Sequence, residues 1–435
     1  MLNQKILIKF FAIENPLVFL YFTSLNLSEY DNHKTGFQLK SIIFFFLQIL
    51  FISAQPVIKS LNIYSGSPSD LPVGQDFTIE FDVKNEFTPE LKLKFLFCDS
   101  QWNPYERYEL ENRGHNFDEA LEYERLPNTV QGADFHFKRK YPSQRVTFPF
   151  SGKWIMQITD MFENDVYAEG YFIVAYDSIN TNVKITKDQS GSFSYHNNLN
   201  KTIRLSASIM IAEKMDPFRL SHIEIIENQK LFYPIIIERG QNDRERYFEW
   251  DASRKMMFVA RDIYPGNEYR KLDLRNKSKY VFPDSKAQFE GIETSRFFDK
   301  GNKDFDGGKH IMNYKDENAN YLNITFQFRP HEKPSGSNIF VVGAFSDWIV
   351  YPEYKMTETD GLYSLTAEIK RGQYDYQYVT GQLNNGYVEN IDWNFYEGNF
   401  FETSNTYTVL VYYKSNENGE YEQIISHKIV KSGGL

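Results

Sequence analysis

Cysteine is almost absent from this 435-residue sequence, in which Cys98 is the single thiol. One thiol cannot form an internal disulfide or supply a cysteine-based zinc site, so disulfide scaffolds and CxxC redox chemistry are excluded. Basic residues are also in deficit, because 48 Lys and Arg against 58 Asp and Glu leave a net charge of −10. This negative charge opposes the phosphate contacts on which nucleic-acid binding depends. Nucleic acid is therefore not an expected partner.

Sequence motifs of common catalytic and cofactor sites are missing as well. There is no GxSxG, GxxxxGK[ST], GxGxxG or HExxH pattern, and none of the eight histidines pairs with another at metal-ligand spacing. We therefore expect no catalytic residue, no cofactor and no metal. The segment Asp304-Phe-Asp306-Gly-Gly resembles the start of a calcium loop, but Lys315 stands where an EF-hand needs its glutamate. We interpret it as an Asp/Gly turn in a solvated connector.

Long apolar runs are scarce, and the clearest one lies near the amino terminus. Lys40 precedes the apolar stretch from Ile42 to Ile52, which the small residues Ser53 and Ala54 follow. This order is typical of a secretory signal, and the stretch is shorter than the about 20 residues that a membrane anchor needs. We expect residues 1–54 to be an upstream extension and signal peptide, and the mature chain to carry no anchor.

The remaining composition favours strands. Aromatic residues make up 17% of the chain, with 38 Phe and 30 Tyr against 5 Trp, and Phe and Tyr suit pleated, half-buried surfaces. Apolar and polar residues alternate at period two in several segments, for example 77–83, 91–97, 203–211 and 324–328. Cys98 follows one of these segments and is expected to be a small buried apolar residue rather than a reactive thiol. The chain length allows roughly two to four domains.

We predict an all-β protein of tandem β-sandwiches with immunoglobulin-like or early-set character. The expected divisions are an N-terminal sandwich over 55–176, a middle β domain with a long connector over 177–317, and a C-terminal sandwich over 318–435. The connector is expected because charged residues, Gly and Pro dominate the last part of the middle stretch.

The C-terminal stretch resembles the early-set modules related to glycogen-binding domains. The resemblance rests on three segments: Val342-Gly-Ala-Phe-Ser-Asp-Trp348, Asp360-Gly-Leu-Tyr363 and Gly372-Gln-Tyr-Asp-Tyr-Gln-Tyr378. Sugar-binding members carry a second Trp where this chain has Gly381-Gln-Leu383. The resemblance implies Trp348 and Trp393 as glycan contacts, although Trp348 also suits a packing role.

The whole chain from about 57 to 415 is similar to the type IX secretion system plug proteins. The matching text is Cys98-Asp-Ser-Gln-Trp102, Ser151-Gly-Lys-Trp154, Pro265-Gly-Asn-Glu-Tyr-Arg-Lys-Leu-Asp-Leu-Arg275, Val341 to Trp348, and Phe395-Tyr-Glu-Gly-Asn-Phe-Phe-Glu-Thr403. This resemblance implies a non-enzymatic periplasmic protein at the inner face of the outer membrane. It would block the pore of the large translocon barrel when no cargo passes, and would meet the membrane through that barrel only.

Two other functions remain open from the sequence. The sugar-module pattern around Trp348 leaves a polysaccharide-binding accessory module as the alternative. An enzyme with two carboxylates facing each other across a cleft is a third hypothesis, because carboxylate separation is a spatial quantity that one sequence does not give.

Overall fold

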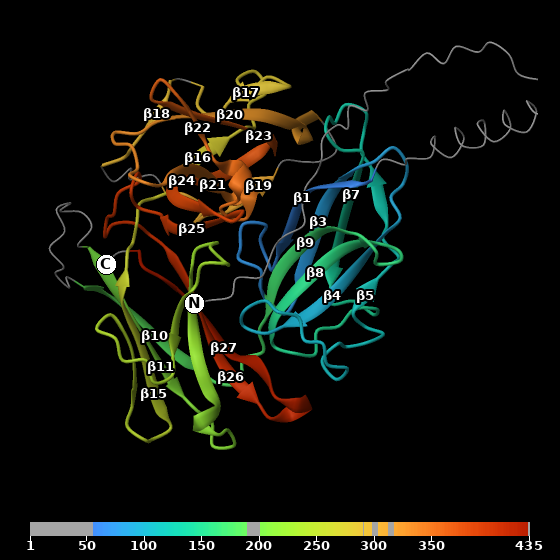
Figure 1. Cartoon of the computed structure of the whole chain (residues 1–435). Coiled ribbons are helices and arrows are strands. Elements are labelled where there is room, and N and C mark those ends of the chain that lie inside the picture. The colour runs from blue at the N-terminus through green and yellow to red at the C-terminus, as the bar shows by residue number, and fades with distance from the viewer. Residues whose placement is uncertain (1–54, 189–200, 290, 298–302, 312–316, 434–435) are drawn as a thin grey trace, which may run out of the picture. The chain divides into compact units, whose positions relative to one another are not determined.

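The computed structural model describes residues 55–188, 201–289, 291–297, 303–311 and 317–433 (Figure 1). Strands dominate these residues, and the helical elements among them are five short 3-10 turns. The all-β expectation is therefore confirmed. Residues Ile58–Leu435 form one unit that contains six sheets. The expected extension and signal peptide at 1–54 lie outside the described residues.

The first sandwich packs two sheets around a core rich in phenylalanine. One sheet has the order β1-β3-β7-β6 and the other β2-β9-β8-β4-β5. The strands are β1 (Val57–Tyr64), β2 (Val73–Gly74), β3 (Phe77–Lys84), β4 (Leu91–Cys98), β5 (Phe117–Asp118), β6 (Tyr123–Arg125), β7 (Phe135–Tyr141), β8 (Gly152–Asp160) and β9 (Val166–Val174). Alternate residues of β3 and β4 point into this core, as their period-two pattern predicts. The ring of Trp154 lies fully buried among them.

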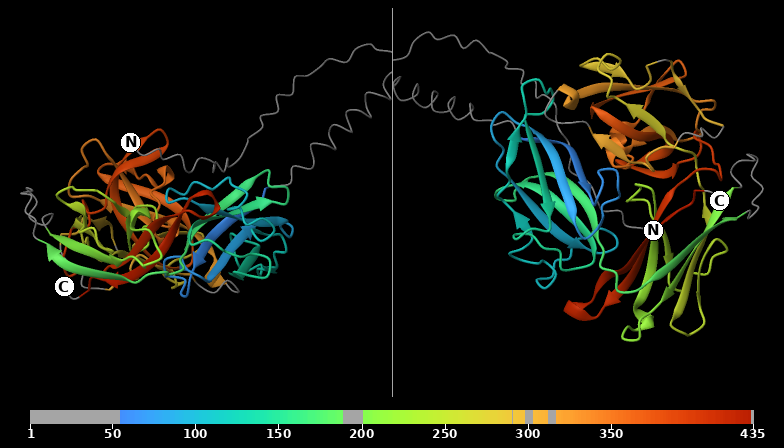
Figure 2. Two further views of the ribbon diagram at one scale, coloured as in Figure 1. Left: turned by 90° about the horizontal axis from the view of Figure 1, so that it is seen from below. Right: turned by 180° about the vertical axis from the view of Figure 1, so that it is seen from behind.

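The second sandwich is built from two separate parts of the chain. One sheet has the order β10-β11-β15-β14, and the other has the order β13-β12-β26-β27. The strands are β10 (Thr181–Asp188), β11 (Thr202–Met210), β12 (Leu220–Glu227), β13 (Ile235–Glu238), β14 (Arg246–Trp250), β15 (Lys255–Ile263), β26 (Thr406–Ser415) and β27 (Tyr421–Lys431). Their core joins Ile and Leu side chains of β11 and β12 to Tyr407, Val409 and Val411 of β26. In Figures 1 and 2 the red C-terminal hairpin accordingly lies with the green strands.

The third sandwich lies, in sequence, between β15 and β26. One sheet centres on the long strand β24, which pairs with β16, β19, β21 and β25, and the other has the order β17-β20-β23-β22 with β18 also on β20. The strands are β16 (Arg270–Asp273), β17 (Asp284–Lys286), β18 (Glu293–Thr294), β19 (Lys309–Ile311), β20 (Tyr321–Arg329), β21 (Asn338–Gly343), β22 (Thr357–Thr359), β23 (Leu362–Lys370), β24 (Gly372–Asn384) and β25 (Tyr387–Asp392). The core is aromatic, with Phe326, Phe328, Tyr376 and Tyr378 buried.

The sheet pairing corrects the expected divisions of the chain. The C-terminal sandwich does not extend over 318–435, because β26 pairs with β12 along seven residues and belongs to the second sandwich. It also does not begin at residue 318, because β16 to β19 come from the expected connector and add edge strands to the third sandwich. The third sandwich is thus an insertion into the second, and only the first division, at about residue 176, matches the sheets.

No helix in the part of the chain that the structure describes is long and apolar enough to cross a membrane.

Candidate functional site

Two chain segments connect the second and third sandwiches, and they bond to each other. We call these segments, 264–269 and 397–405, the crossover junction. Gly266 donates its N–H to Asn399 Oδ1 at 2.8 Å and accepts from the Phe400 N–H at 2.7 Å. Its φ of +69° is a conformation in which a Cβ would be strained. Asn405 donates to Pro265 O at 2.6 Å, so the two segments behave as one connection.

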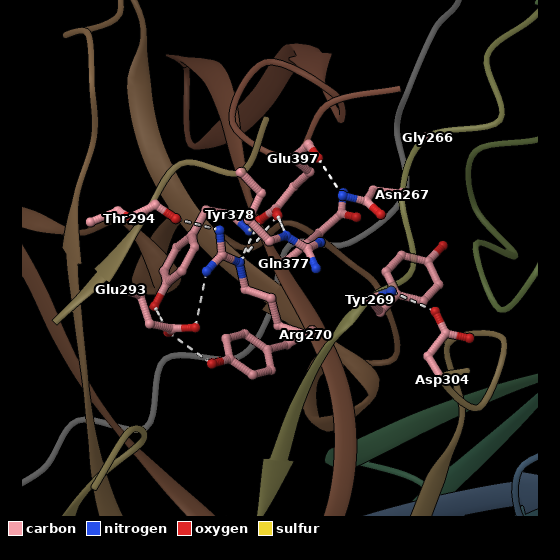
Figure 3. A network of polar contacts seen from close by, with 12 residues as sticks. Gly266, Asn267, Tyr269, Arg270, Glu293, Thr294, Asp304, Gln377, Tyr378 and Glu397 are labelled. Carbon is pink, nitrogen blue, oxygen red and sulfur yellow. Dashed lines mark hydrogen bonds and ion pairs between the residues drawn. The ribbon is translucent and has the colours of Figure 1, made fainter. Parts of the chain in front are cut away.

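A buried ionic network lies beside this junction (Figure 3). Arg270, on β16, contacts Glu397 at 2.9 Å and Glu293 at 3.1 Å, and each of these side chains is less than one-tenth exposed. Arg296 reaches the second oxygen of Glu397 at 2.6 Å. Burial alone would raise the pKa of Glu397, but the two arginines outweigh it and hold that pKa at about 2. The tyrosine hydroxyls of Tyr376 and Tyr378 donate to Glu293 and complete the network.

A second buried group near the junction consists of carboxylates that share no cation at bonding distance. Asp375 Oδ2 accepts from the Phe305 N–H at 2.6 Å and the Gly307 N–H at 3.1 Å, whereas its Oδ1 has no partner among the described residues. Burial and the neighbouring charge of Asp304 raise the pKa of Asp375 to about 8. Burial also raises the pKa of Asp304, to about 6. Asp375 is therefore a carboxyl group that carries its proton at neutral pH.

The first and third sandwiches meet at another buried charge cluster. Asp82 of β3 bonds His136 of β7 at 2.7 Å and forms an ion pair with Lys370 of β23. The Tyr321 hydroxyl of β20 donates to the same carboxylate at 2.7 Å. Burial would raise the pKa of Asp82, but its bonds to His136 and Lys370 hold the pKa below its ordinary value. An apolar cluster that includes Leu126 beside Tyr321 completes the contact.

The first and second sandwiches meet at the pair Lys153–Glu224. Lys153 Nζ of β8 lies 2.9 Å from Glu224 Oε1 of β12, and both side chains are almost fully buried. The ammonium group also donates to Ser100 O at 2.7 Å and lies 4.9 Å from the Trp102 ring centroid. The Tyr412 hydroxyl of β26 donates to the other oxygen of Glu224 at 3.0 Å. Every polar atom of this ion pair thus has a protein partner.

The sequence segments that carried the family resemblance occupy these contacts. Ser100, Trp102 and Lys153 make the contact between the first and second sandwiches, and Ser151 Oγ donates to the Ile424 carbonyl at 2.6 Å. The segments 265–275 and 395–403 form the crossover junction and supply Arg270 and Glu397. Four of the five matching segments therefore lie at joints between sandwiches, and Val341 to Trp348 lies within the third sandwich. None of the matching text lines up acid, base and nucleophile around an open cavity.

The structure brings together the two predicted glycan contacts, Trp348 and Trp393, with ring centroids 6.5 Å apart. It does not present them to a ligand. Trp348 is 1% exposed, donates its indole N–H to Gly307 O at 2.6 Å and packs on Tyr269. Trp393 is partly buried against Tyr233, with Lys230 Nζ over its ring at 4.5 Å. The predicted sugar contact at Trp348 is wrong for this conformation, because stacking needs an exposed ring face.

The calcium-like segment is an Asp/Gly turn, but it is not solvated as expected. Asp304 accepts from the Tyr269 and Asp306 N–H groups, and Asp306 accepts from Thr406 Oγ1 at 2.7 Å. Gly307 and Gly308 are buried. The loop is covered because it packs on the crossover junction, and its carboxylates serve as turn acceptors. No group of three metal-ligating side chains was found in the described part of the chain.

Cys98 is buried, at 1% exposure, as its place after an alternating strand predicted. Burial raises the pKa of this thiol well above its ordinary range. A thiol in this environment is a poor nucleophile.

A cavity of about 100 Å³ lies where the three sandwiches meet. Its lining combines the aromatic residues Tyr171, Phe232, Trp348 and Tyr351 with polar groups that include Asn62. The Asn62 side-chain nitrogen is buried there without a partner among the described residues. The acidic residues that line this cavity are Asp70, Glu169 and Asp347, whereas Asp304 and Asp375 do not line it.

Sequence reasoning missed Asp82, Glu224 and Lys370 at the joints, and also His136 and the Tyr321 hydroxyl that bond to Asp82. Asp82, Glu224 and Lys370 stand at polar positions of their strands, where the pattern predicts a solvent-facing side chain. Another sandwich packs on that face, and the alternation of residues along one strand does not predict whether a second domain covers its polar side.

No family model matches the sequence, and no curated protein matches it. The fold is shared with the crystal structure of a hypothetical protein from Parabacteroides merdae ATCC 43184, at 16% identity and a TM-score of 0.70. The match covers 86% of this chain and 97% of that chain. A marsupial T cell receptor matches at 10% identity over 87% of this chain and 99% of that chain, but its TM-score is 0.16. The likeness to the Parabacteroides protein shows the fold alone, and the match to the T cell receptor carries no argument.

Proposed function

We propose that this chain is a non-enzymatic, periplasmic plug that closes the pore of the type IX secretion translocon barrel when no cargo passes. The resemblance that motivates the proposal runs through residues 57 to 415, and four of its five segments lie at the joints between the sandwiches. A protein that closes a wide channel works by its shape. The residues that fix the arrangement of its domains are therefore the ones such a function needs.

The observation that carries the proposal is the bracing of the three sandwiches by buried charges. Lys153–Glu224 ties the first sandwich to the second, Lys370–Asp82 ties the first to the third, and the crossover junction ties the third to the second. Sliding at a joint would leave a buried charge away from its partner, which is costly, so the pairs hold each joint in one register. Each sandwich therefore contacts both of the others, and this arrangement resists hinge motion between any two sandwiches.

The surface fits a reversible interface better than a permanent one. The chain carries 24% charged residues and a net charge of −10, and interfaces that open and close have polar rims. The alternative, a polysaccharide-binding module, loses its main support because the Trp348 ring is buried.

The test is recovery of the barrel partner. A tagged chain should co-purify with a very large outer-membrane barrel, or its accessory subunits, from its own detergent-solubilised envelope. Mixing the same chain with envelope from a bacterium that lacks type IX secretion provides the control. Deleting the gene should also increase entry of vancomycin, which an intact outer membrane excludes. Recovery of no barrel component, together with unchanged vancomycin entry, would refute the proposal.

A further inference from the structure

Large apolar side chains are concentrated on one exposed segment of the third sandwich. Sixteen large apolar residues of the described chain are exposed, and five of them fall within residues 281–297. We call these five the apolar strip: Val281, Phe282, Phe289, Ile292 and Phe297. Single exposed apolar residues are ordinary, whereas a cluster marks an interaction site.

The strip is held in place by backbone bonds. β17 and β18 both pair in parallel with β20, so the segment follows that strand from Asn323 to Arg329. The Ala287 N–H donates to Thr325 O at 2.9 Å, and the Arg296 N–H donates to Tyr396 O at 2.8 Å. Figure 1 shows β17 and β18 at the rim of the third sandwich. The exposed rings therefore project from a fixed edge.

The charge of this segment is opposite to that of the chain. Residues 275–297 contain five basic and three acidic residues, whereas the whole chain has a net charge of −10. Glu293 is bonded inside the sandwich by Arg270 and two tyrosines, and Arg296 is likewise bonded there by Glu397, so four basic and two acidic residues of the segment remain. The cations stand among the exposed rings: Lys279 and Lys286 are exposed, and Lys279 Nζ lies 5.2 Å from the Phe289 ring centroid.

We propose that the apolar strip docks the protein on a lipid membrane surface that carries anionic headgroups. Phenylalanine and isoleucine side chains insert at the headgroup boundary, and neighbouring lysines are attracted by the negative surface potential. A lipid surface accepts separate protruding side chains without a complementary pocket. A protein partner that matched five spaced apolar groups would need a complementary pocket for them. The contact goes beyond the proposed plug function and does not depend on it, because a chain that bound no barrel would still bind vesicles.

The experiment is vesicle flotation with residues 55–435, which contain all three cores. Vesicles of 30% phosphatidylglycerol and 70% phosphatidylethanolamine should carry the protein upward, and pure phosphatidylcholine vesicles should carry much less. The double variant Phe289→Ser/Phe297→Ser should bind at least ten-fold less. Lys279→Glu/Lys286→Glu should weaken binding to the anionic vesicles and remove its salt dependence.

Matched controls separate the strip from general effects of surface substitution. Phe162→Ser changes a ring that is 84% exposed on the first sandwich, and Lys255→Glu changes an exposed lysine of β15. Both should bind like the wild type, and all variants should keep its thermal unfolding curve. Equal binding by the Phe289/Phe297 variant and the wild type would overturn the proposal, as would absence of binding to anionic vesicles. Loss of barrel recovery by that variant with unchanged vesicle binding would assign the strip to a protein partner instead.

Discussion

Buried ionisable side chains are the unusual feature of this protein at the scale of single residues. Asp82, Lys153, Glu224, Lys370 and Glu397 are each less than one-twentieth exposed. Such pairs give little net stability relative to apolar packing, because removing two charges from water costs about as much as their attraction returns. Their value is specificity, since a buried charge tolerates only the arrangement that supplies its partner. In the pairs Lys153–Glu224 and Lys370–Asp82 the partners belong to different sandwiches, so these two pairs select one arrangement of the domains.

Replacing Lys370 by Met should destabilise the folded chain by about 3 kcal/mol, because Asp82 would stay buried with one of its charged partners missing. Chemical unfolding monitored by tryptophan fluorescence measures the change. Lys428→Met, at an exposed position of β27, is the matched control and should change stability by less than about 0.5 kcal/mol. An effect of Lys370→Met no larger than that of the control would mean that the ion pair does not brace the joint.

Asp375 predicts a dependence of stability on pH. Its folded-state pKa of about 8 lies above its ordinary value of 3.8. The stability that it contributes is therefore fully present below pH 4 and is lost as the pH rises to about 8. Asp375→Asn cannot ionise, and its amide can offer a carbonyl oxygen to Phe305 and Gly307 as the protonated carboxyl does. Relative to the wild type, this variant should gain about 3 kcal/mol of unfolding free energy between pH 4 and pH 8.

The measurement is a pair of denaturant titrations at each pH, compared between the two proteins. Titrating groups remote from Asp375 affect both proteins alike, so the difference isolates Asp375 together with its coupled neighbour Asp304. A difference that stays constant over this pH range would show that the carboxyl ionises normally.

At the scale of elements, the sequence predicted the strands well and their partners poorly. The alternating segments at 77–83, 91–97, 203–211 and 324–328 all lie in strands that bury one face, because period-two patterning is a local property. The assignment of β26 to β12 was not predictable, since it joins residues about 190 positions apart and nothing local encodes the partner. The short strands β17, β18 and β19 were missed because two or three residues show no periodicity. The burial of Trp348 agrees with the packing role that the sequence also allowed, and its cover, Gly307, comes from the loop that was expected to be a solvated connector.

The inserted arrangement predicts which fragments fold. A fragment of residues 264–404 contains every strand of the third sandwich and should give cooperative thermal unfolding. A fragment of residues 318–435 lacks β16 to β19 and carries β26 and β27 without β12, so it should be disordered or aggregate. Circular dichroism during heating distinguishes the two outcomes. Cooperative unfolding of 318–435 alone would contradict the strand assignment.

At the scale of the whole molecule, the joints should make the three sandwiches unfold together. Domains with small polar interfaces move and unfold independently. Here one contact buries Lys153 with Glu224, a second buries Asp82 with Lys370, and the third is a double covalent crossover. Unfolding one sandwich would break these pairs and, for the first and third sandwiches, would also expose the apolar cluster around Leu126 and Tyr321, so partial unfolding is penalised. The same penalty resists bending in the folded state, which is what a pore-closing body requires.

Calorimetry of residues 55–435 should therefore show a single transition. The double variant Lys153→Met/Lys370→Met removes both cations that bind the first sandwich to the other two, and should give a separate, earlier transition for the first sandwich. Lys255→Met/Lys428→Met, at two exposed positions, should keep the single transition. If the proposed plug depends on stiffness, the two double variants should differ when each is expressed in the strain that lacks the gene. At equal protein level, Lys153→Met/Lys370→Met should restore less of the vancomycin barrier than Lys255→Met/Lys428→Met. Separate transitions in the wild type would show that the joints do not couple the sandwiches, and full restoration of the barrier by Lys153→Met/Lys370→Met would show that the plug function does not need the buried pairs.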